Sequence, residues 1–418
     1  MDKLIILGKS DLYGSIRIKG SKNSALPLLV SSLLSDEDLI LQNLPELDDV
    51  NNMEKLLKGY GVDIIKNKNN ITLNSKNIKN RIADYDIVRK MRASILIFGP
   101  LLSKFGEATI SLPGGCAIGT RPIDIHLEGL KKLGATIKIE NGFVHGKANN
   151  FLFGESIRLP YPSVGATENI LMASVLAKGR TIIENAAREP EIEDLANCLN
   201  FMGAKIIGAG SNIIKVVGVD KLFKASHTIM SDRIAAGTFI ILAVMLNKRF
   251  EVKNINTKHL TSLIIILKEM GVKLNIKNES IEILPSKKLK GLKIETAPYP
   301  GFPTDLQAQM MALMSIVDGN SQITEKIFEN RFMHVPELNR LGADIKVIKE
   351  TAYIKGNKNF KGAQVMASDL RASVSLVLAA LSAKGKTVIN RVYHLDRGYE
   401  KIEKTLGNQG PNIKREKK

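Results

Sequence analysis

The sequence contains one clear local pattern in His126-Leu127-Glu128-Gly129-Leu130-Lys131-Lys132-Leu133-Gly134-Ala135-Thr136-Ile137-Lys138-Ile139. Its first eight residues carry apolar side chains at the spacing of an amphipathic helix, and a glycine just past the last apolar residue is a common helix stop. The residues after Gly134 alternate between apolar and polar side chains, which predicts a strand. The stretch therefore predicts a helix that ends at a glycine and is followed by a strand.

This pattern occurs six times, and its glycines lie 68 to 73 residues apart: Gly61, Gly134, Gly203, Gly271, Gly342 and Gly410. Before each copy comes a more apolar helical pattern that opens with small and polar residues. An alternating run then leads to an Asn-marked turn, as in Thr181-Ile182-Ile183-Glu184-Asn185. We interpret the chain as six helix–strand–helix–strand units. A period of about 70 residues is too long for a solenoid, so six units fit two α/β domains of three units each.

Composition limits the classes of protein that remain. The chain is 44% hydrophobic and 24% charged, which excludes a largely disordered or collagen-like protein. The longest clean apolar stretch, Phe239 to Leu246, is too short to cross a membrane, and the apolar run within residues 1–9 is too short for a secretory signal. Two cysteines cannot form a disulfide framework. We expect a cytoplasmic protein without a membrane span.

The net charge of +18 would permit binding to nucleic acid or anionic lipid. However, most of the cations are scattered lysines in Asn- and Ile-rich stretches such as 65–71 and 76–80, and the chain has no Trp. This pattern favours lysines on solvated faces over a stacking platform for single-stranded nucleic acid. We expect no nucleic-acid partner; salt-dependent retention of DNA or RNA would support that alternative.

The first helix of each predicted unit is apolar nearly all round, so we expect it to be buried within its domain. Its N-terminus carries polar residues, and helix N-termini bind anions through N–H groups and the helix dipole. Several cations lie near these unit starts or in the turns that follow: Lys22, Arg92, Arg121, Arg371 and Arg397. If these termini converge between two domains, the substrate should carry several negative charges.

Other chemical motifs are incomplete. Gly385-Lys386-Thr387 lacks the first glycine of a P-loop, because that position is Ala380. The six histidines form no metal-ligand pair four residues apart, and two cysteines are too few for a zinc site. We expect neither a metal nor an organic cofactor.

Longer motifs connect the chain to a known family: Gly20-Ser21-Lys22-Asn23, residues 112–124 (LPGGCAIGTRPID), 162–169 (PSVGATEN), 185–191 (NAAREPE), 302–305 (FPTD), 328–334 (FENRFMH) and 395–400 (LDRGYE). In this order, and almost end to end, they resemble the UDP-N-acetylglucosamine 1-carboxyvinyltransferases, which are enolpyruvyl transferases of peptidoglycan synthesis. Ser21 and Ser24 replace alanines that are commoner beside Lys22-Asn23 in that family.

The resemblance implies two inside-out α/β barrels, each of three repeats. One domain would span residues 22–230 and contain the cysteine loop, and the other would combine residues 1–21 and 231–418, with the active site in the cleft between them. The implied reaction transfers the enolpyruvyl group of phosphoenolpyruvate to the 3-hydroxyl of UDP-N-acetylglucosamine and releases phosphate, by addition and then elimination. It is the first committed step of peptidoglycan synthesis, which links the enzyme to cell shape and division.

The resemblance also implies catalytic roles. Cys116 would be the general acid at the methylene carbon of phosphoenolpyruvate and the site of alkylation by fosfomycin; from composition alone, a small buried hydrophobe is the alternative. Asp305 would be the base at the sugar hydroxyl or its orienting group, with a helix N-cap as the alternative or additional role. Cys198, on an apolar helix face, is expected to be structural.

The remaining implied site residues bind the two substrates, and Lys22 and Arg397 are implied to be catalytic as well. Lys22, Arg121 and Arg397 would hold the phosphate of phosphoenolpyruvate, with Arg92 and Arg371 nearby, since guanidinium groups donate two parallel hydrogen bonds to such anions. For any single arginine, a surface salt bridge is the alternative. The residues expected at the sugar nucleotide are Asn23, Ile327, Arg121, Pro122, Ile123, Asp124, Ser163, Val164 and Gly165.

The nearest alternative enzyme is 5-enolpyruvylshikimate-3-phosphate synthase, which shares fold and reaction type. The cysteine loop and Ser163-Val164-Gly165 argue against it. A non-catalytic homologue is a further alternative, and the presence of every motif residue argues against that. The sequence makes no prediction of oligomeric state.

Overall fold

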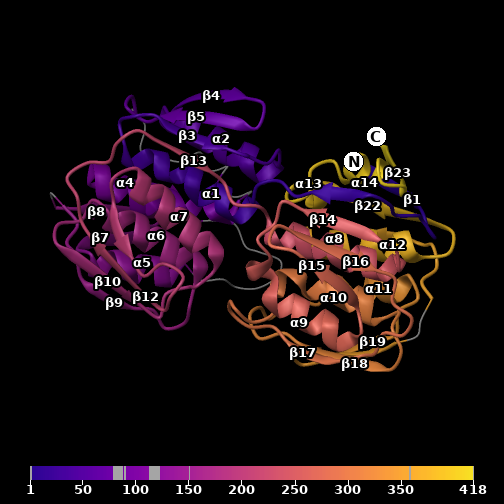
Figure 1. Ribbon diagram of the computed structural model, residues 1–418. Coiled ribbons are helices and arrows are strands. Elements are labelled where there is room, and N and C mark those ends of the chain that lie inside the picture. The colour runs from indigo at the N-terminus through magenta and orange to yellow at the C-terminus, as the bar shows by residue number, and fades with distance from the viewer. Residues whose placement is uncertain are drawn as a thin grey trace. The chain divides into compact units, whose positions relative to one another are not determined.

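The computed structural model describes residues 2–78, 88, 91–112, 123–149, 151–356 and 359–417. These residues form two compact units (Figure 1). The N-terminal unit holds the described residues between 20 and 230. The C-terminal unit combines residues 2–19 with the described residues from 231 onward. The chain therefore begins in one unit, forms the other, and returns.

Helices and strands alternate within the N-terminal unit as the repeats predict. Its helices are α1 (Lys22–Ser31), α2 (Asp48–Tyr60), α4 (Phe98–Phe105), α5 (Asp124–Lys132), α6 (Val164–Ser174) and α7 (Pro190–Phe201), with 3-10 turns η1 (Ser32–Leu34) and η2 (Arg92–Ile97). Its strands are β3 (Leu39–Gln42), β4 (Asp63–Asn67), β5 (Asn70–Asn74), β6 (Glu107–Ser111), β7 (Ala135–Glu140), β8 (Phe143–Ala148), β9 (Ser156–Arg158), β10 (Arg180–Glu184), β11 (Lys205–Ile207), β12 (Ile213–Val217) and β13 (Ala225–Thr228).

The C-terminal unit repeats this alternation. Its helices are α8 (Arg233–Leu246), α9 (Thr261–Met270), α10 (Gln307–Met314), α11 (Val335–Arg340), α12 (Leu370–Ser382), α13 (Tyr393–Asp396) and α14 (Ile402–Gly407), with 3-10 turns η3 (Thr257–Leu260) and η4 (Thr304–Leu306). Its strands are β1 (Lys3–Leu7), β2 (Ser15–Arg17), β14 (Phe250–Lys253), β15 (Lys273–Ile276), β16 (Ser280–Leu284), β17 (Lys293–Glu295), β18 (Asn320–Thr324), β19 (Ile345–Ile348), β20 (Thr351–Lys355), β21 (Gln364–Met366), β22 (Lys386–Asn390) and β23 (Asn412–Glu416).

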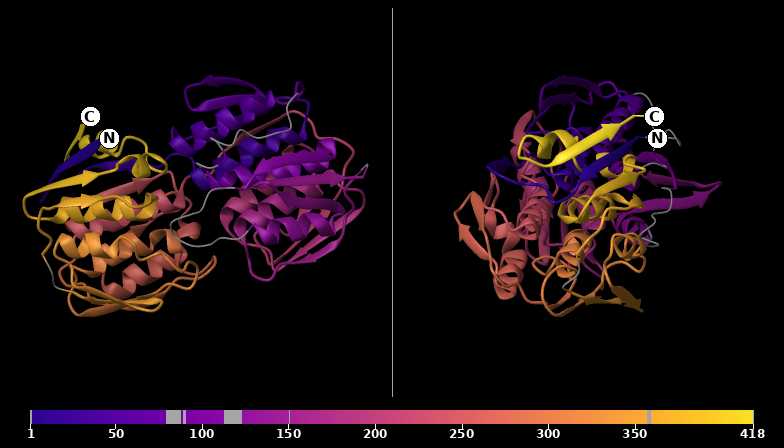
Figure 2. Two further views of the ribbon diagram at one scale, coloured as in Figure 1. Left: turned by 180° about the vertical axis from the view of Figure 1, so that it is seen from behind. Right: turned by 90° about the vertical axis from the view of Figure 1, so that its right-hand side faces the viewer.

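Five four-stranded sheets share one pairing scheme. In the sheet β11-β12-β10-β9, β10 runs parallel to β9 and antiparallel to β12, which in turn pairs antiparallel with β11. The sheets of β3, β14, β18 and β22 repeat this order of one parallel and two antiparallel pairings. In the sheet of β22, the N-terminal strand β1 lies between β22 and β23, so the first and last described strands are neighbours (Figure 2).

The cores confirm that the first helix is an inner helix in five of the six predicted repeats. On α1 and α6 nearly every residue after the first turn is buried, and α8, α10 and α12 are likewise buried on all sides within the C-terminal unit. Sheets surround these helices in each unit (Figures 1 and 2), which is the inside-out barrel that the resemblance implies. Two separate hydrophobic clusters form the two cores.

The repeated glycines have a common backbone conformation. All six adopt positive φ, between 97° and 111°, a region that L side chains rarely enter. Gly61 and Gly271 end α2 and α9 as left-handed C-caps. The six-unit interpretation is therefore confirmed by the same residues that suggested it. No helix among the described residues combines the length and apolarity that spanning a membrane requires.

Candidate active site

Asp305 lies between two arginines in the C-terminal unit. Its Oδ1 accepts a hydrogen bond from Arg331 Nη2 and its Oδ2 one from Arg371 Nη2, each over 2.9 Å. The side chains of Arg331 and Arg371 are 4% and 5% exposed, whereas that of Asp305 is 25% exposed. The cluster is thus a partly accessible carboxylate with two buried guanidiniums, and these two positive charges exceed the single negative one.

Burial and charge oppose each other at Arg371. Burial alone would lower its pKa, but the Asp305 carboxylate and other nearby groups more than offset that effect and raise it. Arg371 is therefore a permanent cation. Its Nη1 also donates to Tyr399 Oη over 3.4 Å, and burial raises the pKa of Tyr399. The phenol consequently remains a neutral hydrogen-bonding group.

Asp305 does not act as a helix cap. It lies inside η4, which begins after Pro303 and has no side-chain cap, and α10 has none either. The N-cap expectation for Asp305 is therefore wrong, because its carboxylate is directed to Arg331 and Arg371. Gln309 Nε2 donates to the Asp305 carbonyl over 3.0 Å and to Thr238 Oγ1 over 3.0 Å, so α8 and α10 hold the backbone of Asp305 together.

Glu325 holds a second part of this site. Thr296 Oγ1 and Thr304 Oγ1 each donate to its carboxylate over 2.8 Å, and the Ile327 backbone N–H donates over 2.9 Å. Glu325 follows β18 and is 4% exposed. Through these bonds, one carboxylate fixes both the entry to η4, where Asp305 lies, and the backbone of Ile327.

Arg397 occupies the C-cap of α13. The preceding Asp396 is held by Arg415, whose Nη1 and Nη2 donate to its two carboxylate oxygens over 2.9 and 2.6 Å. The following Gly398 packs so closely against Leu370 that a Cβ would lie 2.7 Å from the leucine methyl groups. This contact brings the backbones of Arg397 and Arg371 near each other.

In the N-terminal unit, Lys22 lies at the meeting of two helix starts. Lys22 and Asn23 form the first turn of α1, and both are half-buried. Lys22 Nζ donates to Asp49 Oδ2 over 3.4 Å, and Asp49 belongs to the first turn of α2. The ammonium group is therefore held near the N-termini of α1 and α2, a position that suits an anionic ligand.

Asn169, on α6, connects η2 and the starts of α4 and α5 in this unit. Its Nδ2 donates to the Ile95 carbonyl over 3.1 Å and to His126 Nδ1 over 3.2 Å, and its Oδ1 accepts from Gly99 N over 2.9 Å. Burial, followed by the charge of Arg92, lowers the pKa of His126 to about 3. His126 is thus neutral, which matches its role as an acceptor at Nδ1.

The other predicted residues of this unit lie at the starts of these same elements. Arg92 opens η2, Ile123 and Asp124 open α5, and Ser163 caps α6 by accepting from the Ala166 N–H over 3.4 Å. Val164 and Gly165 form the first turn of α6, and a Cβ on Gly165 would lie 3.2 Å from His126 Cε1. His126 and Asn169 therefore connect the region of Arg92 to that of Gly165.

Three predicted residues, Cys116, Arg121 and Pro122, lie outside the described residues. The other cysteine, Cys198, is fully buried, as expected for a structural residue. Burial, together with Asp194, raises its pKa to about 12 against a weaker opposite effect of a hydrogen bond to Ser31. Among the described residues, no group of three or more histidines, cysteines or acids is arranged to hold a metal ion.

Sequence reasoning gave no role to Arg331, Glu325, Asn169 or His126. Arg331 and Asn169 belong to motifs that carried the resemblance, but nothing in local spacing indicates their partners. Glu325 directly follows β18, and this position at the end of a strand is the sequence signal that could have found it. Each of the four contacts a segment that contains a predicted site residue.

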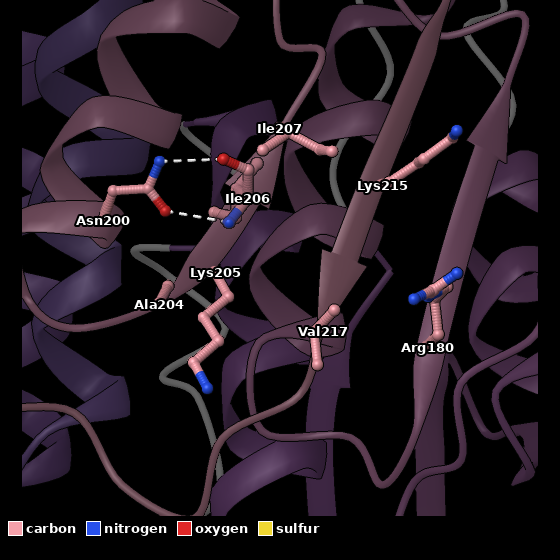
Figure 3. A pocket seen from close by; sticks show the side chains of 8 residues that line it. All are labelled: Arg180, Asn200, Ala204, Lys205, Ile206, Ile207, Lys215 and Val217. Atoms are coloured by element: carbon pink, nitrogen blue, oxygen red, sulfur yellow. Dashed lines mark hydrogen bonds between the residues drawn. The ribbon is translucent and has the colours of Figure 1, made fainter.

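A hollow of about 450 Å³ lies elsewhere, on the outer side of the β10, β11 and β12 sheet (Figure 3). In it, the Asn200 amide exchanges hydrogen bonds of 3.0 and 2.9 Å with the backbone of Ile206. Its other lining residues are Arg180, Ala204, Lys205, Ile207, Lys215 and Val217. None is a predicted site residue, so this hollow is not the candidate active site.

Comparison with known proteins gives a consistent result. Residues 6–406 match the family model of EPSP synthase (3-phosphoshikimate 1-carboxyvinyltransferase). The UDP-N-acetylglucosamine 1-carboxyvinyltransferase of Pelagibacter ubique is 51% identical over 415 residues, covering 99% of this chain and all of that protein. The protein of the same name from Gluconacetobacter diazotrophicus is 51% identical over 417 residues, covering 99% of each chain.

Solved structures show the same fold. The enolpyruvyl transferase NikO from Streptomyces tendae matches with a TM-score of 0.91 at 23% identity, over 99% of this chain and 98% of that one. EPSP synthase from Acinetobacter baumannii matches with a TM-score of 0.78 at 19% identity, over the full length of both chains. At these identities, the two structures establish the architecture alone.

Proposed function

This chain belongs to the EPSP synthase superfamily and, within it, to the family of UDP-N-acetylglucosamine 1-carboxyvinyltransferases, and we propose that its activity is that of the family. The protein transfers the enolpyruvyl group of phosphoenolpyruvate to the 3-hydroxyl of UDP-N-acetylglucosamine and releases phosphate, a step of peptidoglycan synthesis. The observation that carries this conclusion is the 51% identity over essentially the whole length of both chains.

The C-terminal unit contributes a carboxylate in a cationic setting. We propose that Asp305 orients the sugar 3-hydroxyl and takes its proton, since its side chain is partly exposed while Arg331 and Arg371 fix both of its oxygens. The positive charges of Arg371 and Arg397 suit the phosphate and carboxylate groups of phosphoenolpyruvate. Fixed charges of this kind hold the anionic groups of phosphoenolpyruvate and stabilise the negative charge that develops on phosphate as it departs. Ile327 is proposed to contact the sugar nucleotide.

The N-terminal unit contributes further anion-binding groups. We assign Lys22, with Arg92 and Arg121, to the phosphate of phosphoenolpyruvate, and Asn23 to the sugar. The diphosphate and uridine are assigned to two helix starts, where backbone N–H groups and the dipole favour anions. The residues at those starts are Arg121, Pro122, Ile123, Asp124, Ser163, Val164 and Gly165. Cys116 is proposed to protonate the methylene carbon.

A substrate assay tests this function. Phosphate release from phosphoenolpyruvate is measured with UDP-N-acetylglucosamine, with shikimate 3-phosphate, and with neither acceptor. We expect release only with UDP-N-acetylglucosamine, because the full-length relatives at about half identity carry that activity in their names. Release with shikimate 3-phosphate alone would establish the sister activity instead. We also propose a cytoplasmic location for this activity.

A further inference from the structure

The carboxylate of Asp194, on α7, joins three parts of the N-terminal unit that lie far apart in the sequence. Its Oδ2 accepts hydrogen bonds from the Ser24 hydroxyl and from the Met230 N–H, the latter over 3.2 Å, and its Oδ1 binds His227 Nε2 over 2.9 Å. An ionised carboxylate only accepts hydrogen bonds, so the other three groups donate. The side chains of Asp194 and His227 are 10% and 8% exposed, and Ser24 is fully buried.

A second set of bonds continues this network to the cap of α1. Ser21 N–H donates to the Met230 carbonyl over 2.7 Å, and Ser21 Oγ accepts from the Ser24 N–H over 3.3 Å. Met230 thus receives a hydrogen bond from the cap residue and gives one to Asp194. As a result, Ser21 and Ser24 are each bonded to groups outside α1. These two serines flank Lys22 and Asn23 directly.

We propose that Ser24 and Asp194 are positioning residues that set the orientation of Lys22 and Asn23 for substrate binding. This inference rests on the proposed function, in which Lys22 binds phosphate and Asn23 binds the sugar. Ser24 cannot contact substrate itself, because it is fully buried and its hydroxyl donates to Asp194. The network acts through the backbone of the first turn of α1, which carries the side chains of Lys22 and Asn23.

The physical argument concerns where the effect should appear. A group that binds phosphate in both the substrate complex and the transition state changes KM with little change in kcat. A hydrogen bond to a charged group is itself worth about a tenfold or greater factor in binding affinity. Only part of that loss reaches Lys22 and Asn23. We therefore expect Ser24→Ala to raise KM for each of the two substrates by about three- to tenfold.

Ser31→Ala is the matched control. Ser31 lies at the other end of α1, is fully buried, and donates from Oγ to the Leu28 carbonyl over 2.7 Å. Its hydroxyl also contacts Cys198 on α7, the helix that carries Asp194. Both substitutions therefore remove a buried hydroxyl between the same two helices, but only one of them lies beside Lys22.

The experiment measures KM for both substrates, kcat and the unfolding temperature in the wild type, Ser24→Ala, Ser31→Ala and Asp194→Asn. Alanine favours helix more than serine does, so Ser24→Ala should fold, and Asp194→Asn is a second test that keeps the shape of the side chain. We expect KM to rise in Ser24→Ala and Asp194→Asn and to stay at the wild-type value in Ser31→Ala. The double variant Ser24→Ala/Asp194→Asn should have a KM no higher than that of the more affected single variant.

The outcomes separate this inference from the proposed function. A wild-type protein that does not release phosphate would overturn the proposed function itself. If the wild type is active but Ser24→Ala and Asp194→Asn keep wild-type KM values, the positioning role is overturned. Equal KM changes in Ser24→Ala and Ser31→Ala, in proportion to lost stability, would also overturn it, because the network would then serve folding alone.

Discussion

Arg371 Nη2 donates to Asp305 Oδ2 over 2.9 Å, from a guanidinium that is almost wholly buried to a carboxylate that is partly accessible. The arginine cannot lose its charge, because the nearby carboxylate raises its pKa despite burial. A buried cation of this kind needs a fixed anionic partner. Asp305 therefore has a structural duty to Arg371 as well as its proposed role at the sugar hydroxyl, and the two duties can be separated by substitution.

Asp305→Asn should abolish turnover and also reduce stability. The amide keeps the size of the side chain but removes the ionised partner that Arg331 and Arg371 share. The hydrogen bonds at risk are to charged groups, so we expect a loss of about 1–3 kcal/mol in the free energy of unfolding, at the lower end because Asp305 is partly exposed. Phosphate release and urea unfolding measure the two effects. Substitution of the exposed Glu295 by Gln is the control, and wild-type activity in Asp305→Asn would contradict the proposed role.

Arg397→Ala should weaken the binding of phosphoenolpyruvate far more than that of UDP-N-acetylglucosamine. One charge-assisted contact contributes about 1.5–3 kcal/mol, which predicts roughly a ten- to hundredfold loss of apparent affinity. Steady-state KM values for each substrate and calorimetric binding of the sugar nucleotide measure the difference. Arg340, an exposed arginine on α11, provides the control substitution to alanine. An equal loss for both substrates would instead mean that Arg397 supports folding.

The pH dependence of stability should reflect a neutral, buried histidine. His126 has a folded-state pKa of about 3, against an ordinary value of 6.5, so the unfolded chain binds the extra proton between these values. Stability from this residue is therefore complete above pH 6.5 and falls as the pH decreases toward 3. The expected cost between pH 7 and pH 5.5 is about 1 kcal/mol.

The variant His126→Asn isolates this effect. Asparagine offers an acceptor to Asn169 but does not take up a proton in this range. Urea unfolding at several pH values should show that the stability advantage of the wild type over the variant shrinks from pH 7 to pH 4. Buried His334, whose pKa burial lowers to about 4, remains in both proteins and cancels in the comparison. A constant difference at all pH values would refute the assignment of a neutral His126.

Local sequence rules predicted the repeat but not the partners within the site. The six glycines were predictable because a helix stop followed by a strand needs a positive φ, and all six have one. The inner helices were predictable because their own apolar residues cover nearly every side of each helix. By contrast, Arg331 meets Asp305 across 26 positions and His227 meets Asp194 across 33. Such pairings depend on how helices, strands and loops pack in the folded protein, and no local spacing encodes that packing.

The N-cap expectation for Asp305 failed for the same reason. Asp is a good cap by propensity, but here the tertiary fold brings two arginines to its carboxylate, and charged partners are stronger than an exposed backbone N–H. Tertiary contacts thus overrode local preference at the residue with the most specific proposed chemistry. The Ser24–Asp194 bond was equally hidden, since the sequence showed only a serine where alanine is commoner.

Fosfomycin should modify Cys116 and leave Cys198 untouched. The thiolate is the reactive form of cysteine, and burial, aided by Asp194, raises the pKa of Cys198 to about 12. Cys198 is also fully buried, so it lacks both the charge and the access that attack on an epoxide requires. Peptide mass spectrometry after incubation with the inhibitor should locate the adduct on the peptide that contains Cys116. Iodoacetamide in denaturant should then label Cys198, which shows that its protection comes from the fold.

The substitution Cys116→Asp tests the proposed role of the thiol as a proton donor. A carboxylic acid can protonate the methylene carbon of phosphoenolpyruvate, but it offers no sulfur for alkylation. The variant should therefore keep turnover and lose sensitivity to fosfomycin, whereas Cys116→Ala should lose turnover because alanine carries no proton to donate. Inactivation of the wild type should slow with excess phosphoenolpyruvate, since the inhibitor's phosphonate competes for the same cations. Full activity in Cys116→Ala, or an adduct on Cys198, would show that another residue supplies the proton.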